Sequence, residues 1–274
     1  MNLRTFVINL DRDTERMAEM AQRLNALQLP FERVPAVLGR SLGTDERSTL
    51  YDAGANRRQY HSPLVDGEIG CYASHLRLWQ RLAAEAVSPA QAPAAVYLVL
   101  EDDVLLDASV REVADALGRC ASGWDMVKLM GRRREAKAEA LPLTASTALL
   151  RYRRPPSLTG AYLLTAAGAA KLAAARQPFF RPVDIDIRHW WECDLRLFGV
   201  FPYPAREAPA AVASTIGQRR GLARGVRWRL RKWWVQSAYL WASQRAWQQG
   251  PPPWPAVPPA LTPALAPTVS PEAS

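Results

Sequence analysis

The stretch "YLVLEDDVLLD", residues 97–107, ends an apolar run with three consecutive carboxylates, Glu101, Asp102 and Asp103. The apolar residues 94–100 predict a buried central strand. Side chains alternate along a strand, so Glu101 and Asp103 are expected to point to one side and Asp102 to the other. Two like charges about 4 Å apart repel by roughly 1 kcal/mol in water and about 4 kcal/mol at an effective dielectric constant near 20. A bound cation would offset this repulsion, although a solvated acidic turn has the same composition.

Strands and helices alternate on both sides of this stretch. Residues 44–66 are polar and predict an irregular connection. The other segments predict, in order, strands at residues 5–10 and 31–37, a helix at 68–86, a strand at 124–130, and a strand that enters a helix near Thr165. This alternation predicts an α/β sandwich with a mainly parallel central sheet. Such sheets bind ligands at the carboxyl ends of their strands, where Glu101 and Asp103 stand.

Five segments occur in a specific order: "VINLDRDTER" (7–16), "GEIGCYASHLRLW" (67–79), "VLEDD" (99–103), "TGAYLLTAAGAAKL" (159–172) and "PVDIDI" (182–187). Together they resemble glycosyltransferase family 25, over roughly residues 4–217. Bacterial members of that family build lipo-oligosaccharide, and animal relatives galactosylate collagen. The resemblance implies a GT-A-like nucleotide-sugar-binding domain, a UDP-sugar donor, and transfer of a hexose, galactose above all, with inversion at the anomeric carbon.

The resemblance also implies a metal site. Asp103 would bind Mn²⁺ or Mg²⁺ directly, Glu101 would act through water or the donor ribose, and Asp102 would support them. Hard oxygen ligands of this kind suit both ions. The chain departs from the family's DxD motif in having Glu101 at the first position.

Inversion by direct displacement requires a general base for the acceptor hydroxyl. Asp184 matches the family's Pro-x-Asp position, and Asp186, Glu192 and Asp194 are alternatives. If this segment is extended, Asp184 and Asp186 share a face. If it is helical, its aspartates would instead stabilise a helix N-terminus.

Further residues match family positions expected beside the donor. These are Asn9, Arg12, Arg16, Ser74, His75 and Gly160, together with Asp102. Each also has a structural interpretation. An arginine on a helix face can be a solvated charge, His75 can orient an acidic neighbour or be a buried structural histidine, and Gly160 can serve a tight strand entry.

Positive charge is concentrated near the C-terminus. From residue 208 onward there are eight basic residues and one acid, a net charge of +7, which leaves +2 of the chain's +9 for the rest. The sequence therefore predicts a catalytic domain at residues 1–217, a basic Arg/Trp-rich amphipathic helix at 218–248, and a Pro-rich disordered tail at 249–274. Basic helices with tryptophan bind anionic bilayers, so residues 219–247 predict membrane attachment. The same helix could instead pack its tryptophans on the catalytic domain.

Three widely spaced cysteines and the lack of a secretory signal or an 18-residue apolar run favour a cytoplasmic protein, peripheral on the cytoplasmic face of the inner membrane. The expected partners are a UDP-sugar, a saccharide or lipid-linked glycan acceptor of the lipopolysaccharide type, and that membrane surface. Two other functions use the same features: a metal-dependent hydrolase, and a nucleic-acid-binding protein acting through the basic segment. The nearly neutral body argues against nucleic acid.

Overall fold

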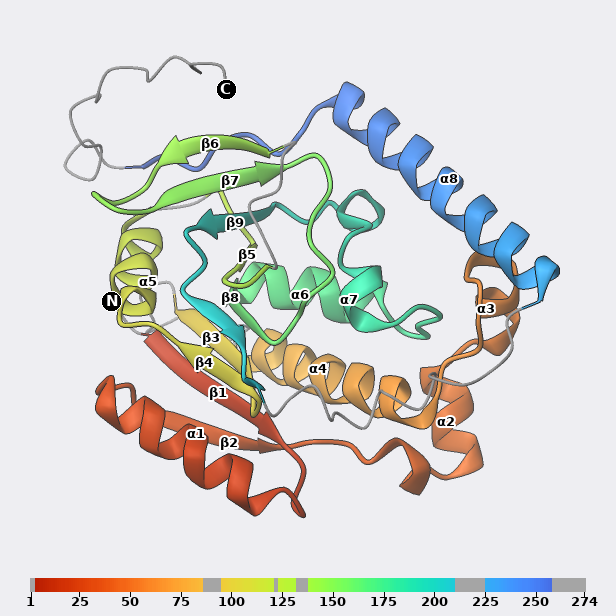
Figure 1. Ribbon diagram of the computed structural model, residues 1–274, viewed down its shortest axis with the longest axis horizontal. Helices are drawn as coiled ribbons and strands as arrows, with labels where there is room; N and C mark the ends of the chain where they lie inside the picture. Colours follow the sequence, from red (N-terminus) through yellow and green to blue (C-terminus); the bar gives the residue numbers. More distant parts are fainter. Residues whose placement is uncertain (1–2, 86–94, 121–122, 132–137, 210–224, 258–274) are drawn as a thin grey trace.

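A mixed eight-stranded sheet forms the centre of the protein in the computed structural model, which describes residues 3–85, 95–120, 123–131, 138–209 and 225–257 (Figure 1). The strand order is β2-β1-β3-β8-β5-β9-β7-β6. These strands are β1 (Leu3–Asn9), β2 (Phe31–Pro35), β3 (Val96–Glu101), β5 (Met126–Lys128), β6 (Ala138–Pro142), β7 (Ala148–Tyr152), β8 (Ala161–Thr165) and β9 (Leu197–Phe201). A separate ribbon pairs β4 (Val104–Leu106) with β10 (Ala205–Glu207).

Strand direction confirms the predicted α/β class. Strand β1 runs parallel to β2 and β3, and β5 runs parallel to β9. Strand β8 is antiparallel to both β3 and β5, and β7 is antiparallel to both β6 and β9. Six of the eight strands therefore point the same way, while β7 and β8 oppose them and make the sheet mixed.

Helices cover both faces of the sheet, because alternate strand residues are apolar in both directions. On one face Val7 and Leu98 belong to the core formed with α1 (Thr14–Ala26) and α5 (Ser109–Arg119). On the other, Phe6 and Val99 belong to the core formed with α4 (Asp66–Glu85), α6 (Ala166–Ala175) and α7 (Val183–Asp186). The central strand β3 is thus buried between two helical layers.

The prediction of an irregular connection at residues 44–66 is wrong. Two short helices occupy most of it, α2 (Thr44–Leu50) and α3 (Ala53–Gln59). The Asp52 side chain caps α3 by accepting a hydrogen bond from the Ala55 amide at 2.8 Å. Each helix has only seven residues, too few to show a helical periodicity in the sequence.

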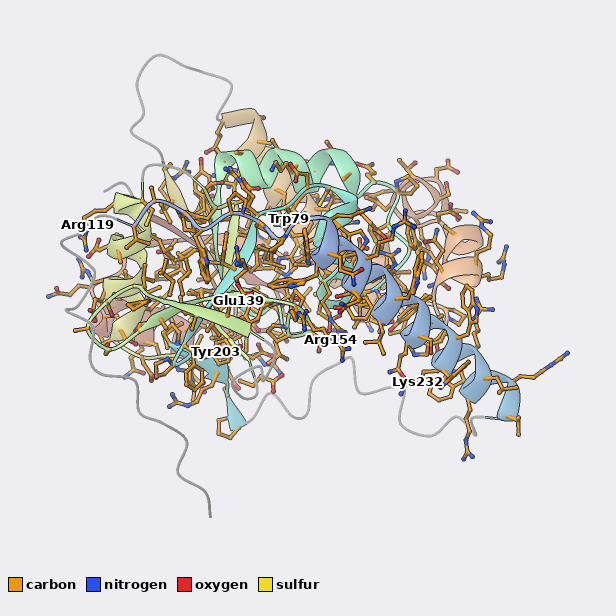
Figure 2. The ribbon with its side chains drawn as sticks, turned by 90° about the horizontal axis from the view of Figure 1, so that it is seen from above. Trp79, Arg119, Glu139, Arg154, Tyr203 and Lys232 are labelled. Carbon is orange, nitrogen blue, oxygen red and sulfur yellow. The ribbon has the colours of Figure 1, made fainter. Side chains whose placement is uncertain are left out.

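The described part of the basic segment forms a long helix, α8 (Val226–Gln249), along the outer side of the domain, with Arg154 beside it and Lys232 in its N-terminal half (Figure 2). Residues 218–224 of the segment lie outside the described residues. One face of α8 packs on the domain. The Trp228 indole donates to Ser62 Oγ at 2.9 Å, and Ser243 donates to the Arg153 carbonyl at 2.8 Å. No helix among the described residues is long and apolar enough to span a membrane.

The prediction of a disordered tail beginning at residue 249 is wrong for residues 251–257. The Trp254 ring stacks on Phe198 at 5.8 Å between ring centres, and the Arg151 guanidinium lies 4.7 Å from the centre of the same indole. Arg151 also donates to the Pro252 carbonyl at 3.1 Å. Tryptophan burial and cation–π contact hold this Pro-rich segment on the sheet. Residues 258–274 lie outside the described residues.

Candidate active site

Two cavities meet at the carboxyl end of β3. The first, which we call the arginine cavity, has a volume of about 230 Å³ and lies between the β1–α1 turn, residues 36–40 and the start of α4. The second, the carboxylate cavity, has a volume of about 370 Å³ and lies between Tyr60, residues 157–160 and residues 182–185. Glu101 and Asp103 line both cavities. The sequence prediction that these two carboxylates face a common space is therefore confirmed. The prediction that Asp102 points to the other side is wrong, because Asp102 also lines the arginine cavity from the turn that follows β3.

The electrostatics of the three acids fit a bound cation. Burial, with the neighbouring charges of Glu101 and Asp102, raises the pKa of Asp103 to about 6. Burial also raises the pKa of Asp102, although a hydrogen bond from Asn9 opposes the shift. A divalent ion on Glu101 and Asp103 would relieve this repulsion with oxygen ligands that Mg²⁺ and Mn²⁺ prefer.

Asn9 positions Asp102. Its Nδ2 donates to Asp102 Oδ2 at 2.7 Å and to the Asp13 carbonyl at 3.0 Å. Its Oδ1 accepts from Arg33 Nε at 2.9 Å, and the residue is buried. Both amide hydrogens are therefore used within the protein. We assign Asn9 a positioning role; because it also lines the arginine cavity, its contact with the donor stays a prediction.

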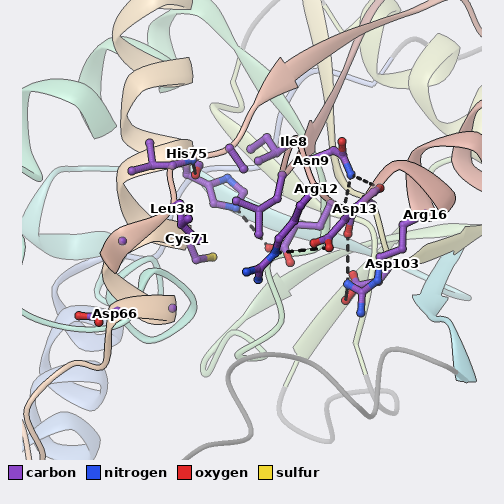
Figure 3. Close-up of a pocket in the computed structure, with 18 of the residues that line it drawn as sticks. Ile8, Asn9, Arg12, Asp13, Arg16, Leu38, Asp66, Cys71, His75 and Asp103 are labelled. Carbon is purple, nitrogen blue, oxygen red and sulfur yellow. Dashed lines mark hydrogen bonds and ion pairs between the residues drawn. The ribbon is translucent and has the colours of Figure 1, made fainter. Parts of the chain in front are cut away.

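Arg12 and Arg16 project into the arginine cavity from the β1–α1 turn and the start of α1 (Figure 3). Arg16 lies 3.5 Å from Asp102 Oδ1 and 4.0 Å from Asp103 Oδ2. Arg12 lies 3.6 Å from its neighbour Asp13, and its side chain is 43% exposed. Partly exposed guanidinium groups beside a cavity are suited to binding phosphate oxygens.

His75 orients Glu101 through a buried chain of hydrogen bonds. Trp79 Nε1 can only donate, and it does so to the Tyr162 hydroxyl oxygen at 2.9 Å. The hydroxyl hydrogen of Tyr162 then points to His75 Nδ1 at 2.9 Å, which leaves Nε2 protonated to donate to Glu101 Oε1 at 3.2 Å. Of the roles left open by the sequence, the structure favours the one in which His75 holds an acidic neighbour.

Cys71 completes a group whose ligand atoms, with those of His75 and Glu101, lie within 4.8 Å of one another. This set could hold a metal ion by its spacing alone. Burial, together with the charge of Glu101, raises the pKa of the Cys71 thiol well above its ordinary value. Because His75 Nε2 already bonds to Glu101 Oε1, we interpret the group as a support for Glu101.

Ser74 holds the wall of the arginine cavity. Its hydroxyl donates to the Gly70 carbonyl at 2.7 Å and accepts from the Val37 amide at 2.8 Å. A Cβ atom on Gly70 would collide with the Val37 carbonyl oxygen, and one on Gly39 would collide with the Asp66 carbonyl oxygen. The backbone of residues 37–39 therefore lies directly on α4, and Ser74 fastens it there.

Gly160 lies at the entry to β8, where its carbonyl accepts from the Glu101 amide at 2.8 Å. It also lines the carboxylate cavity. A Cβ atom at this position would lie 3.0 Å from both Met130 Sδ and Val104 Cγ2. Close packing accounts for the glycine, and a contact with donor sugar stays a prediction.

Asp184 and Asp186 do not share a face. The segment forms α7, so the helical one of the two alternatives left open by the sequence is the one observed. Asp184 lines the carboxylate cavity, and burial raises its pKa to about 6 against the opposing charge of Lys128. Asp186 is buried on the other side, where it accepts from Tyr72 at 2.5 Å and from Arg181 at 2.9 Å.

The two remaining base candidates also lie apart from the carboxylate cavity. Glu192 accepts hydrogen bonds from Arg176 and Arg181, each at 2.9 Å. The Asp194 side chain is 96% exposed and lies 3.6 Å from Lys171 Nζ. Asp184 is therefore the base candidate that faces the same cavity as Glu101 and Asp103.

Sequence reasoning missed Lys128 and Tyr162. Lys128 is almost fully buried in β5, and its charge acts on Asp184. A lysine in the apolar run "DMVKLM" is itself a signal, because lysine is seldom fully buried. Tyr162 gives no such signal, since its role depends on Trp79 and His75, which lie in another segment of the chain.

An α/β sandwich with acids at the carboxyl end of a central strand, beside an arginine-lined cavity, is consistent with a GT-A-like fold. The sequence profile of one family, described as glycosyltransferase family 25 (LPS biosynthesis protein), matches residues 2–187. This chain belongs to glycosyltransferase family 25, which confirms the resemblance found in its motifs.

Curated relatives agree with this assignment. A protein of Drosophila pseudoobscura pseudoobscura named glycosyltransferase 25 family member is 32% identical over 66% of this chain and 28% of its own length. Human procollagen galactosyltransferase 2 is 27% identical over 66% of this chain and 29% of its own length. The mouse inactive glycosyltransferase 25 family member 3 is 30% identical over 72% of this chain and 35% of its own length. The chain spans about a third of the length of these relatives.

Proposed function

We propose that this protein is an inverting, metal-dependent hexosyltransferase that transfers galactose from UDP-galactose to a saccharide hydroxyl of lipopolysaccharide or a related glycan. One observation carries the proposal. Glu101 and Asp103 stand between a cavity with exposed arginines and a cavity with a raised-pKa carboxylate, so a donor and an acceptor can meet at them.

The arginine cavity would take the nucleotide part of the donor. Arg12 and Arg16 would bind the diphosphate, while Asn9 and His75 hold Asp102 and Glu101 in place. Mn²⁺ or Mg²⁺ bound by Glu101 and Asp103 would stabilise the negative charge that develops on departing UDP.

The carboxylate cavity would take the acceptor. Asp184 would accept the proton of the acceptor hydroxyl as the new glycosidic bond forms and the bond to UDP breaks. A pKa of about 6 leaves Asp184 ionised at neutral pH while keeping it a stronger base than an ordinary aspartate.

The names of relatives support the sugar and the pathway. The human relative is a galactosyltransferase by name, and the family description refers to LPS biosynthesis. The mouse relative is named inactive, so activity itself is part of the proposal.

We also propose that α8 attaches the protein to the cytoplasmic face of an anionic membrane. Its outer face carries a stripe of exposed apolar side chains at helical spacing: Val226, Leu230, Trp233 and Trp241. Exposed Arg227, Arg229 and Arg245 lie beside the stripe, and α8 contains no acidic residue. Tryptophan and arginine on one helix face favour the interface of an anionic bilayer.

Vesicle flotation tests the membrane attachment. Deleting α8 would uncover the domain core, because Ala246 and Val235 pack against it. Substitution of the outer face avoids this problem. Trp233→Ser with Trp241→Ser should release the full chain from phosphatidylglycerol vesicles, and Gln248→Ser is a matched control on the exposed surface of the same helix. Equal binding by all three proteins would contradict the attachment.

Thermal unfolding with UDP-galactose, with and without Mn²⁺, tests the transferase proposal. A ligand at one hundred times its dissociation constant adds about 2.7 kcal/mol of apparent stability. We expect a shift that needs both donor and metal. The absence of a shift with any UDP-sugar would contradict the proposal, and UDP release that does not depend on an acceptor would favour a hydrolase.

A further inference from the structure

A third cavity, of about 550 Å³, lies between α8 and the segment around α7. We call it the α8 cavity. Its lining comes from residues 59–61, residues 181–192, the inner part of α8 and Arg154. Tyr60 and Ile185 line both this cavity and the carboxylate cavity, so the two are adjacent.

The lining of the α8 cavity is positively charged. Arg154 is exposed and has no ion pair within the described part of the chain. Arg188 lies 4.4 Å from the centre of the Tyr239 ring, and its Nε is buried without a hydrogen-bond partner in the same described ranges. Glu192 is the one carboxylate among the described lining residues. Its charge is already balanced by Arg181, which donates to both of its oxygens at 2.9 Å.

Aromatic rings form much of the remaining wall, and His189 adds no charge. Tyr60, His61, Trp191 and Tyr239 all line the cavity. Burial, together with the nearby charge of Arg181, lowers the pKa of His189 to about 3, so its ring is neutral. Arginine cations beside aromatic faces suit a ligand that joins an anionic group to a ring with apolar faces.

We propose that the α8 cavity binds an anionic substituent, a phosphate or a carboxylate, on the acceptor saccharide, so that the substrate class is an acidic glycan. This inference rests on the proposed function, because it takes Asp184 as the base that faces the acceptor hydroxyl. Arg154 and Arg188 bind the anion, and the aromatic wall holds the sugar ring that carries it.

The position of Arg188 relative to Asp184 indicates how far the anionic group lies from the acceptor hydroxyl. The two residues are four apart, and the turn of α7 continues past Asp186, since the Arg188 amide donates to the Ile185 carbonyl at 3.2 Å. Four residues of helix rise by about 6 Å. This backbone separation, with the shared wall of the two cavities, is compatible with an anionic group on the sugar that accepts the hexose or on its immediate neighbour.

Equilibrium binding of small sugars to the full chain tests the proposal without donor or metal. The probes are glucose 6-phosphate, galacturonate, neutral glucose and inorganic phosphate, measured by titration calorimetry. We expect at least one acidic sugar to bind tenfold or more tightly than glucose and than phosphate alone. The double variant Arg154→Gln/Arg188→Gln should lose that preference, whereas Arg119→Gln, on α5 at the far side of the molecule, should keep it (Figure 2).

The phosphate and carboxylate probes separate the two sources of negative charge. Binding of an acidic sugar that the double variant retains would overturn the site, and so would equal binding of glucose.

Circular dichroism of each variant shows whether it folds. The shift in thermal unfolding on adding UDP-galactose and Mn²⁺ is measured on the same proteins. In the unaltered protein, absence of that shift alone defeats the proposed function, whereas absence of an acidic-sugar preference alone defeats only the proposal for the α8 cavity.

Discussion

The segments around Glu101–Asp103 and Asp184–Asp186 both place two acids two residues apart, but only the first pair has both side chains facing the same cavity. Glu101 and Asp103 follow a strand and line the same two cavities. Asp184 and Asp186 lie in a helical turn, where two residues are separated by about 200° around the axis. One acid therefore faces the cavity, while the other is buried against Arg181. Glu101 ends β3 and Asp103 lies in the turn before β4, so spacing in the sequence does not by itself decide whether two side chains meet.

The largest expected effect separates Asp184 from the other acids of its segment. Asp184→Asn should lower turnover by about 10²- to 10⁴-fold, the usual contribution of a general base. The measurement is the initial rate of UDP formation with donor and acceptor. The matched control is Asp194→Asn, whose side chain is 96% exposed. Turnover retained by Asp184→Asn would move the base elsewhere.

The pH dependence of the initial rate of UDP formation gives a second test of Asp184 as the base. The pKa of Asp184 is about 6, set by burial and by the charges of Lys128, Glu68 and Arg188 that act on it. The base is ionised above this pH, so the rate should rise as the pH increases through about 6 and then level off. A rate that is constant from pH 5 to 8 would contradict the assignment.

Asp186 should matter for stability instead. Asp186→Asn breaks a buried ion pair with Arg181 and should lower the free energy of unfolding by about 3 kcal/mol. Asp184→Asn should not lower the free energy of unfolding. The folded pKa of Asp184 lies above its ordinary 3.8, so its charged form costs stability, and that cost is fully present above pH 6. Urea denaturation at pH 7 compares the Asp184→Asn and Asp186→Asn variants. Equal losses of unfolding free energy would contradict the separate roles assigned to the two acids.

The smallest effect concerns the support of Glu101. Tyr162→Phe removes the hydroxyl between Trp79 and His75 and should weaken metal-dependent donor binding by about tenfold, as outer-shell changes do. Tyr152→Phe, in another buried strand, is the matched control. Comparable donor affinity in both variants would mean that the chain of hydrogen bonds does not hold Glu101.

Local features of the fold could be predicted from the sequence. The strand-to-helix change at Thr165 is marked by a capping residue, and Thr165 Oγ1 does accept from the Gly168 amide at 3.0 Å. The apolar run before Glu101 is likewise a buried strand. Both depend on neighbours within a few residues.

Features that depend on distant partners could not be predicted. Asn9 binds Asp102 across 93 residues of sequence, and Trp254 stacks on Phe198 in a strand far upstream. The family positions therefore indicated the right neighbourhood, but they did not distinguish side chains that face a ligand from side chains that hold others in place. Asp186 is the clearest example, because its arginine partner decides its role.

Titration calorimetry of UDP-galactose with Mn²⁺ into Asp103→Asn and Asp184→Asn tests the division between donor and acceptor sides most directly. Asp107→Asn, an exposed acid that pairs with Arg206, is the control for the charge change. Loss of a metal ligand is worth several kcal/mol, so Asp103→Asn should bind the donor at least about 100-fold more weakly. Asp184→Asn should bind it as the unaltered protein does. Unchanged affinity in Asp103→Asn, or an equal loss in Asp184→Asn, would contradict the account.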